Sequence, residues 1–206
     1  MQDTDWEQSL ARLQCAPDAQ QRQQLQAYLH LLQRWNRVYN LTAIRDPEQM
    51  LPLHVWDSLS VVAHVQAARC LDVGSGAGLP GIPLVIMRPE HHYVLLDTNG
   101  KKACLQQAAP ELGLKNVEVA QQRVELWQPA QPFPAIISRA FASLADFVTV
   151  TAAHLQDDGI LYAMKGRYPD TEVADLPMGW SVNRVHRLDV PGLEAERHLL
   201  ELIRTA

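Results

Sequence analysis

The chain has 206 residues and a formal net charge of −5, and 47% of its residues are hydrophobic while 20% are charged. This length favours one main domain with a helical addition, and the composition is that of a globular protein. The acidic balance argues against a generic nucleic-acid coat protein, although one local basic patch can still bind RNA.

The N-terminus lacks the basic start and apolar run of a secretory signal. No stretch approaches the ~18 apolar residues of a membrane span. We therefore expect a soluble, cytoplasmic protein that does not enter a membrane.

Three cysteines, Cys15, Cys70 and Cys104, lack the paired spacing of a disulfide framework or a zinc site. We expect them to be reduced and packed, because a free cysteine behaves as a small hydrophobe. The eight histidines show no HExxH or HxxxH pattern, so we predict no metal.

The first third of the chain predicts helices. Asp18 precedes Gln21 by three residues, a spacing typical of a capping box. Apolar residues then recur at three- and four-residue steps as far as Trp35, and Asn40 is the predicted stop. A second helix is predicted over residues 47–62.

From residue 69 onward, short apolar segments alternate with segments of helix potential, which predicts a mostly parallel sheet. Two further apolar segments around Pro191 and Gly192 predict a C-terminal antiparallel hairpin. We expect residues 1–66 to form an N-terminal helical extension packed on a core domain of residues 67–206. The predicted strands are 70–73, 92–96, 117–120, 135–138, 160–164, 180–189 and 198–203, and the helices of this part are 81–88, 99–112 and 143–155.

A glycine-rich segment, residues 71–81, follows the first predicted strand and begins a helix. Its glycines let backbone N–H groups approach a ligand closely. Read from Gly76, the segment matches the GxGxxG dinucleotide fingerprint. Read from Asp72, it resembles motif I of class I methyltransferases. A carboxylate at Asp72 repels a pyrophosphate but attracts the ammonium and sulfonium groups of S-adenosylmethionine, which favours a methyltransferase. A dinucleotide enzyme and a loop without a ligand remain the alternatives.

Two more segments extend this predicted site. Asp97 ends the second predicted strand, where a carboxylate can accept hydrogen bonds from ribose hydroxyls or, alternatively, cap the following helix. Val124 and Glu125 follow the third strand, where such a fold meets the adenine edge. The backbone N–H and side chain of Val124 suit that contact, whereas Glu125 alone is equally compatible with a surface charge.

Six motifs, in a fixed order over nearly the whole chain, point to a particular family. Through these motifs the sequence resembles the RsmG/GidB family of bacterial 16S rRNA guanine-N7 methyltransferases. The motifs are Trp35–Thr42, His54–Leu59, Asp72–Pro83, Leu96–Lys102, Ser138–Ala142 and Met164–Gly166.

The resemblance implies a class I methyltransferase Rossmann-like fold and S-adenosylmethionine as cofactor. The implied substrate is N7 of one guanine, nucleotide 527 in the 530 loop of 16S rRNA, within the small ribosomal subunit. The implied cofactor contacts are at Gly74, Leu79, Val124, Glu125 and Arg139, and the local motifs add Asp72, Ser75, Gly76, Gly78, Asp97 and Thr98.

Guanine N7 has an in-plane lone pair and no proton to lose, so methyl transfer to it requires no general base. We expect positioning and exclusion of water to supply catalysis, with Arg139 as a positioning residue between cofactor and RNA. We also expect His54 and Asp57 to close over the cofactor site. The candidates for RNA contact are Phe141, Lys165, Arg167 and, at a position that resembles a basic residue of the family, Arg197.

Two other functions stay open at this stage. A ribosome-binding protein can keep this fold without turnover, and a methyltransferase of this fold can act on another substrate. The complete glycine-rich segment argues against a protein without turnover, and only the family resemblance favours rRNA. We expect a monomer.

Overall fold

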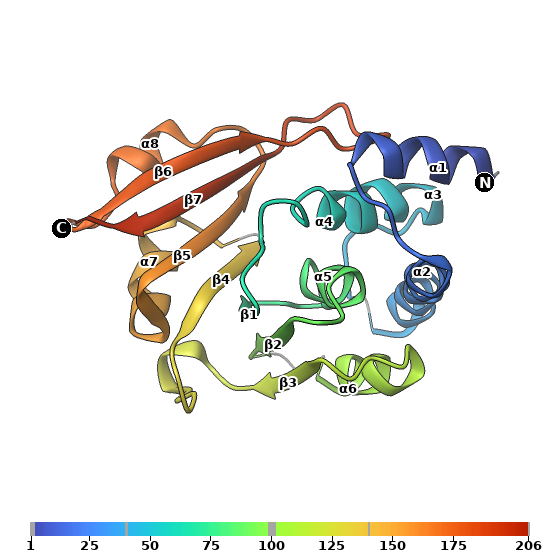
Figure 1. Cartoon of the computed structure of the whole chain (residues 1–206), viewed down its shortest axis with the longest axis horizontal. Coiled ribbons are helices and arrows are strands. Elements are labelled where there is room, and N and C mark those ends of the chain that lie inside the picture. Colours follow the sequence, from blue (N-terminus) through green and yellow to red (C-terminus); the bar gives the residue numbers. More distant parts are fainter. Residues whose placement is uncertain (1–2, 40, 99–101, 140, 206) are drawn as a thin grey trace.

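The computed structural model describes residues 3–39, 41–98, 102–139 and 141–205. A seven-stranded sheet of order β3-β2-β1-β4-β5-β7-β6 crosses the molecule (Figure 1). β1 to β5 pair in parallel, and β7 lies antiparallel between β5 and β6. The predicted mostly parallel sheet with a C-terminal antiparallel pair is therefore confirmed. The strands are β1 (Arg69–Val73), β2 (His92–Asp97), β3 (Val117–Gln121), β4 (Phe133–Arg139), β5 (Leu155–Lys165), β6 (Trp180–Arg187) and β7 (His198–Arg204).

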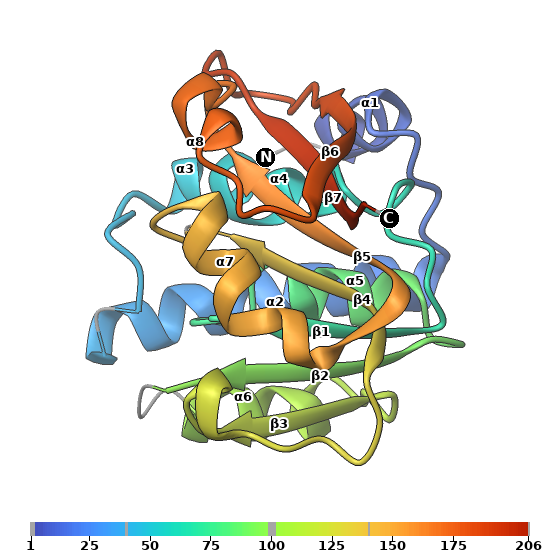
Figure 2. The same ribbon diagram turned by 90° about the vertical axis from the view of Figure 1, so that its left-hand side faces the viewer.

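Helices cover both faces of the sheet, as the alternation of buried side chains along the strands requires. In β1, Leu71 and Val73 pack on one face while Cys70 packs on the other. Figure 2 shows α7 in front of the sheet, with α2 and α5 behind it. The helices are α1 (Asp3–Arg12), α2 (Ala19–Tyr39), α3 (Pro47–Met50), α4 (Asp57–Leu59), α5 (Gly81–Met87), α6 (Lys102–Glu111), α7 (Leu144–Thr151) and α8 (Asp170–Ala174).

The N-terminal helices pack on the sheet through one continuous apolar cluster, which includes Trp6, Tyr28 and Trp56 together with Tyr93 and Ile137 of the sheet. The predicted capping box of α2 is confirmed: the Gln21 N–H donates to Asp18 Oδ1, and the Asp18 N–H donates to Gln21 Oε1. α1 was not expected from the sequence. The predicted stop at Asn40 and the predicted helix start over residues 99–101 lie outside the described residues.

The helix predicted over residues 47–62 is present, but it is not a uniform α-helix. α3 is followed by a π-helical segment, Leu51–Trp56, before α4 begins. Pro52 lies inside this segment and has no N–H to donate, which disturbs the regular ladder of i to i+4 hydrogen bonds. Such wide turns are frequent at functional sites. The irregular turn carries His54 and leads directly into Asp57.

The C-terminal hairpin has a longer connection than the Pro191-Gly192 turn alone. Residues 188–197 join β6 to β7, with Gly192 at a φ of +74°. This connection reaches back to the N-terminal helices, where Arg12 pairs with Asp189. α8, which follows β5, was also not expected.

The three cysteines are free and buried, as expected. Among the described residues, no helix is both long and apolar enough to span a bilayer.

Candidate active site

The glycine-rich loop after β1 is held in a conformation that side chains disfavour. Gly74, Gly76 and Gly78 have φ angles of +71°, +57° and +95°. The Gly74 N–H donates to the Leu96 carbonyl oxygen at 2.8 Å, which joins the loop to β2. At Gly78 a Cβ atom would lie 2.6 Å from Ile82 and 2.8 Å from Leu105. Glycine is therefore required here for both backbone conformation and space.

Two carboxylates hold this loop in place. Asp72 is fully buried below it and accepts a hydrogen bond from the Gly81 N–H at 2.9 Å. Asp97 at the end of β2 accepts from the Gly76 N–H at 2.7 Å. The two acids thus fix the start of α5 and the middle of the loop.

The buried position of Asp72 changes its acidity. Burial raises its pKa to about 7, because desolvation disfavours the charged form, and the Gly81 N–H and Arg139 oppose this effect. Its Oδ1 and the nearby Ser75 Oγ are buried and have no hydrogen-bond partner among the described residues. Within the described part of the chain, one carboxylate oxygen of Asp72 is thus left without a hydrogen-bond partner below the loop.

A first cavity of about 350 Å³ opens beside the loop, and we name it the loop cavity. Asp97 and Thr98 border it after β2, and Val124 and Glu125 border it after β3. His154 Nε2 lies 2.8 Å from the Val124 carbonyl oxygen and thus anchors the short 3₁₀ helix Val124–Leu126. The full lining is Val73, Gly74, Leu96, Asp97, Thr98, Gln122, Arg123, Val124, Glu125, Phe141 and Val150.

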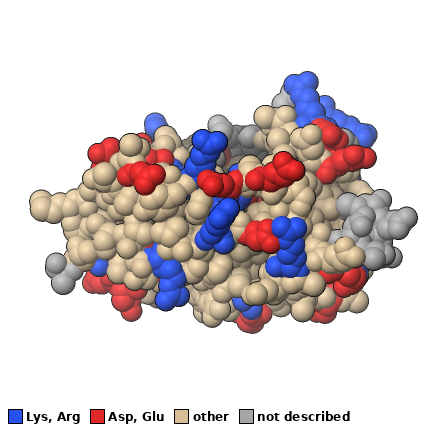
Figure 3. All heavy atoms as spheres, turned by 90° about the horizontal axis from the view of Figure 1, so that it is seen from above, with Lys and Arg blue, Asp and Glu red and all other residues tan. Residues whose placement is uncertain are grey.

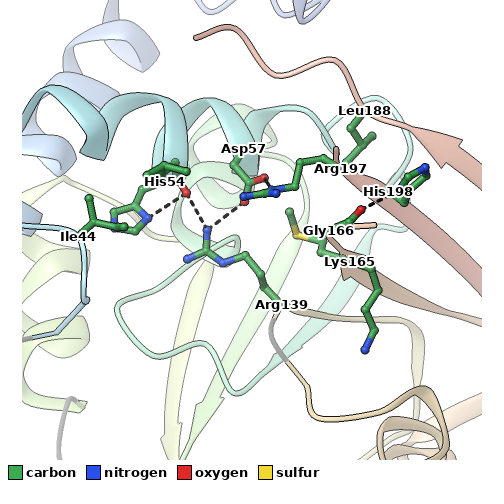
Figure 4. A pocket seen from close by; sticks show the side chains of 11 residues that line it. Ile44, His54, Asp57, Arg139, Lys165, Gly166, Leu188, Arg197 and His198 are labelled. Carbon is green, nitrogen blue, oxygen red and sulfur yellow. Dashed lines mark hydrogen bonds and ion pairs between the residues drawn. The ribbon is translucent and has the colours of Figure 1, made fainter. Parts of the chain in front are cut away.

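A second cavity of about 470 Å³ lies at the carboxyl ends of β4 and β5, and we name it the arginine cavity. Asp57 Oδ2 accepts from Arg139 Nη1 at 3.1 Å, and its Oδ1 accepts from Arg197 Nε at 3.0 Å (Figure 4). The lining is Ile44, Leu53, His54, Asp57, Arg139, Met164, Lys165, Gly166, Leu188, Arg197 and His198.

His54 extends this network toward the loop before α3. The Leu53 carbonyl oxygen accepts from Arg139 Nη1 at 3.3 Å and lies 3.0 Å from His54 Nδ1, so Nδ1 carries the proton. Nε2 is 3.0 Å from the Thr42 hydroxyl and accepts from it. Burial, aided by the charge of Arg139, lowers the pKa of His54 to about 4. The imidazole is therefore neutral near pH 7.

The structure divides the predicted site residues between the two cavities. Gly74, Asp97, Thr98, Val124 and Glu125 line the loop cavity, whereas Asp72, Ser75, Gly76, Gly78 and Leu79 support it without lining it. Arg139, Lys165 and Arg197 line the arginine cavity, together with His54 and Asp57.

Three of the residues proposed for RNA contact have surroundings that the sequence did not suggest. Phe141 borders the loop cavity and packs against Phe147, with ring centroids 5.2 Å apart. Lys165 Nζ is 2.7 Å from Glu172 Oε2, and in Figure 4 its side chain points away from Asp57. Arg167 is exposed and lines neither cavity.

Charges of both signs adjoin one another on the face shown in Figure 3. At the arginine cavity, each of the basic residues Arg139, Arg197 and Lys165 is paired with an acidic residue. This arrangement suits local contacts better than a broad electrostatic attraction.

Comparison with solved structures identifies the fold. The chain superimposes on a glycopeptide N-methyltransferase, MtfA, in complex with S-adenosylmethionine, with a TM-score of 0.63 and 10% identity over 74% of this chain and 95% of that one. A SAM-dependent methyltransferase from Aquifex aeolicus gives a TM-score of 0.58 and 18% identity over 77% and 94%. The fold is that of the class I methyltransferases.

Sequence comparison then gives the family. The model of rRNA small subunit methyltransferase G (GidB) matches residues 21–200. The ribosomal RNA small subunit methyltransferase G of Shewanella amazonensis is 48% identical over 96% of this chain and 96% of its own length. The chain belongs to the rRNA small subunit methyltransferase G family, as its motifs indicated.

Proposed function

We propose that the chain uses S-adenosylmethionine to methylate N7 of one guanine, nucleotide 527, in the 16S rRNA of the small ribosomal subunit. Family membership supports an rRNA substrate. The observation that carries the proposal is the pair of cavities, which border the carboxyl ends of neighbouring parallel strands, the usual place for ligands in such sheets.

The loop cavity fits the cofactor. The space beside Gly74 is open, because a Cβ atom placed on this residue would have no other atom within 4 Å. Asp97 lies where a carboxylate can accept from ribose hydroxyls, and the buried Asp72 and Ser75 oxygens lie below the loop. Val124 and Phe141 offer apolar surface for an adenine ring.

When bound, S-adenosylmethionine supplies a methyl group already activated by its sulfonium, so the carbon–sulfur bond breaks as the carbon–N7 bond forms. N7 loses no proton in this transfer, so no residue acts as a general base. The neutral His54 of the arginine cavity is consistent with this mechanism. Both of its ring nitrogens are engaged by Leu53 and Thr42, so neither is free to take a proton from the substrate.

The residues of the chain therefore contribute to catalysis by positioning the cofactor and the RNA base. Arg139 ends β4, one residue beyond Ser138, whose hydroxyl donates to the Val73 carbonyl oxygen at 2.7 Å. That bond joins the end of β4 to the strand that begins the glycine-rich loop. Arg139 lines the arginine cavity and not the loop cavity, so we expect it to orient the RNA base beside the cofactor rather than to bind the cofactor itself.

The test is transfer of tritium from labelled S-adenosylmethionine to small ribosomal subunits from cells that lack this gene, with the labelled nucleotide then mapped. We expect label on one guanine, at a site that chemistry specific for 7-methylguanosine cleaves. Label at another base or another atom would refute the assigned site. Cofactor binding without label in RNA would refute the rRNA substrate. The chain would then be a methyltransferase that acts on another acceptor, or a protein that only binds the ribosome.

A further inference from the structure

Asp57 joins three distant parts of the chain at the wall of the arginine cavity. Its side chain is 3% exposed, and its two oxygens bind one arginine each, Arg139 and Arg197. A buried carboxylate needs partners of opposite charge, and the two arginines supply one for each of its oxygens. In turn, the acid keeps two guanidinium groups close together that would otherwise repel each other.

The remainder of the cavity is suited to a flat, partly apolar ligand. Ile44, Leu53, Met164 and Leu188 contribute apolar surface, while the arginine pair supplies hydrogen-bond donors at one side (Figure 4). Arg139 Nη1 donates to Asp57 and to the Leu53 carbonyl oxygen, but its Nη2 has no hydrogen-bond partner among the described residues. The cavity therefore combines walls for a ring with donors for an acceptor atom on its edge.

We propose that the arginine cavity receives the target guanine and that Asp57 is the positioning residue that directs Arg139 and Arg197 toward its O6. This inference rests on the proposed function. Arginine commonly binds guanine through O6 and N7 together. Here N7 must keep its lone pair for the methyl carbon, which leaves O6 as the acceptor on that edge.

The charge of Asp57 also suits the reaction. As the methyl group moves, positive charge develops on the purine, and two uncompensated guanidinium groups would oppose it. The carboxylate of Asp57, held 3.1 and 3.0 Å from them, offsets that repulsion. Because this charge develops only during transfer, Asp57 stabilises the transition state more than the bound substrate.

The first experiment compares Asp57→Asn with Asp57→Glu in single-turnover methylation of small subunits that lack the modification. We expect Asp57→Asn to lower the rate about 10²-fold, as for a misplaced positioning group. Asp57→Glu should recover part of that loss. Subunit binding should not weaken, because the variant makes the cavity more positive toward an anionic ligand.

Asp157→Asn is the matched control, since it removes an exposed carboxylate from Arg204 at the other end of β5. We expect it to keep the full rate. An Asp57→Asn enzyme that methylates guanine at the full rate, or that loses rate only through weaker subunit binding, would overturn the inference.

The second experiment uses the unaltered protein, so its outcome does not depend on whether a variant folds. Small subunits are reconstituted with 2,6-diaminopurine at the target, which replaces the O6 acceptor with an amino donor and leaves N7 intact. We expect the rate to fall about as far as Asp57→Asn lowers it on guanine, on the order of 10²-fold. Equal rates on the two bases would overturn the inference, whereas no transfer to guanine itself would overturn the proposed function instead.

Discussion

The two cavities are built in different ways. The loop cavity draws most of its lining from residues that directly follow β1, β2 and β3, so each part of it is local in sequence. The arginine cavity combines the segment around His54 and Asp57 with the ends of β4 and β5 and with Arg197. One cavity is thus specified by short motifs, and the other exists only after distant segments have packed together.

The two regions also differ in packing. At Gly78 a methyl group would be within 2.6 Å of Ile82, while at Gly166 the nearest atoms, on Arg197 and Glu196, are 3.9 Å away. The loop is closely packed at Gly78, whereas the rim of the arginine cavity leaves room at Gly166. The following predictions use this difference, from the largest expected effect to the smallest.

Replacing glycine with alanine should destabilise the protein much more at Gly78 than at Gly166. We expect Gly78→Ala to lower the free energy of unfolding by at least about 2 kcal/mol, because it combines overpacking with a φ of +95°. Gly166→Ala should change it by less than about 1 kcal/mol. Urea denaturation of both variants measures this contrast, and equal losses would show that the packing difference is not real.

The buried acid below the loop should make stability depend on pH. The folded-state pKa of Asp72 is raised to about 7, so the folded protein binds the proton more tightly than the unfolded chain. Its contribution to stability therefore falls as pH rises from about 4 to 8, by roughly 2 kcal/mol between pH 5 and 7, and is nearly constant above about pH 8. Urea denaturation at several pH values should show this slope in the natural protein and a smaller one in Asp72→Asn.

Cofactor binding and methyl transfer should differ in their response to pH. Ionised Asp72 attracts a cationic cofactor, so affinity for S-adenosylmethionine should weaken as pH falls below about 7, by a fewfold per unit. The single-turnover rate with both sites saturated should stay nearly flat between about pH 6.5 and 9, because N7 loses no proton. A bell-shaped rate profile under saturation would contradict the mechanism without a general base.

The sequence predicted most of the sheet and the loop cavity because their signals are local. Apolar runs located β1 to β5, and the glycine spacing with Asp97 located the loop. The role of Asp57 could not be predicted, since its partners Arg139 and Arg197 are 82 and 140 residues away. Likewise, the sequence shows that residue 165 is a lysine, but only the structure shows that it forms an ion pair with Glu172.

Irregular helices escaped prediction for a related reason. The apolar spacing over residues 47–62 fits a single helix, and only the packed structure shows the π-helical segment around Pro52. A short helix such as α8 has too few residues to establish a period. Its Glu172 accepts a hydrogen bond from the Leu144 N–H at the start of α7, which ties the two helices together.

Calorimetric titration of S-adenosylmethionine into Asp97→Ala and Arg197→Ala tests most directly whether the two cavities have separate roles. The account predicts that Asp97→Ala weakens binding at least about tenfold, because a carboxylate hydrogen-bonded to ribose contributes roughly 1.5–3 kcal/mol. Arg197→Ala should leave the affinity within about twofold, since Arg197 lines only the arginine cavity. Equal weakening in both variants, or unchanged binding in Asp97→Ala, would contradict the assignment of the cofactor to the loop cavity.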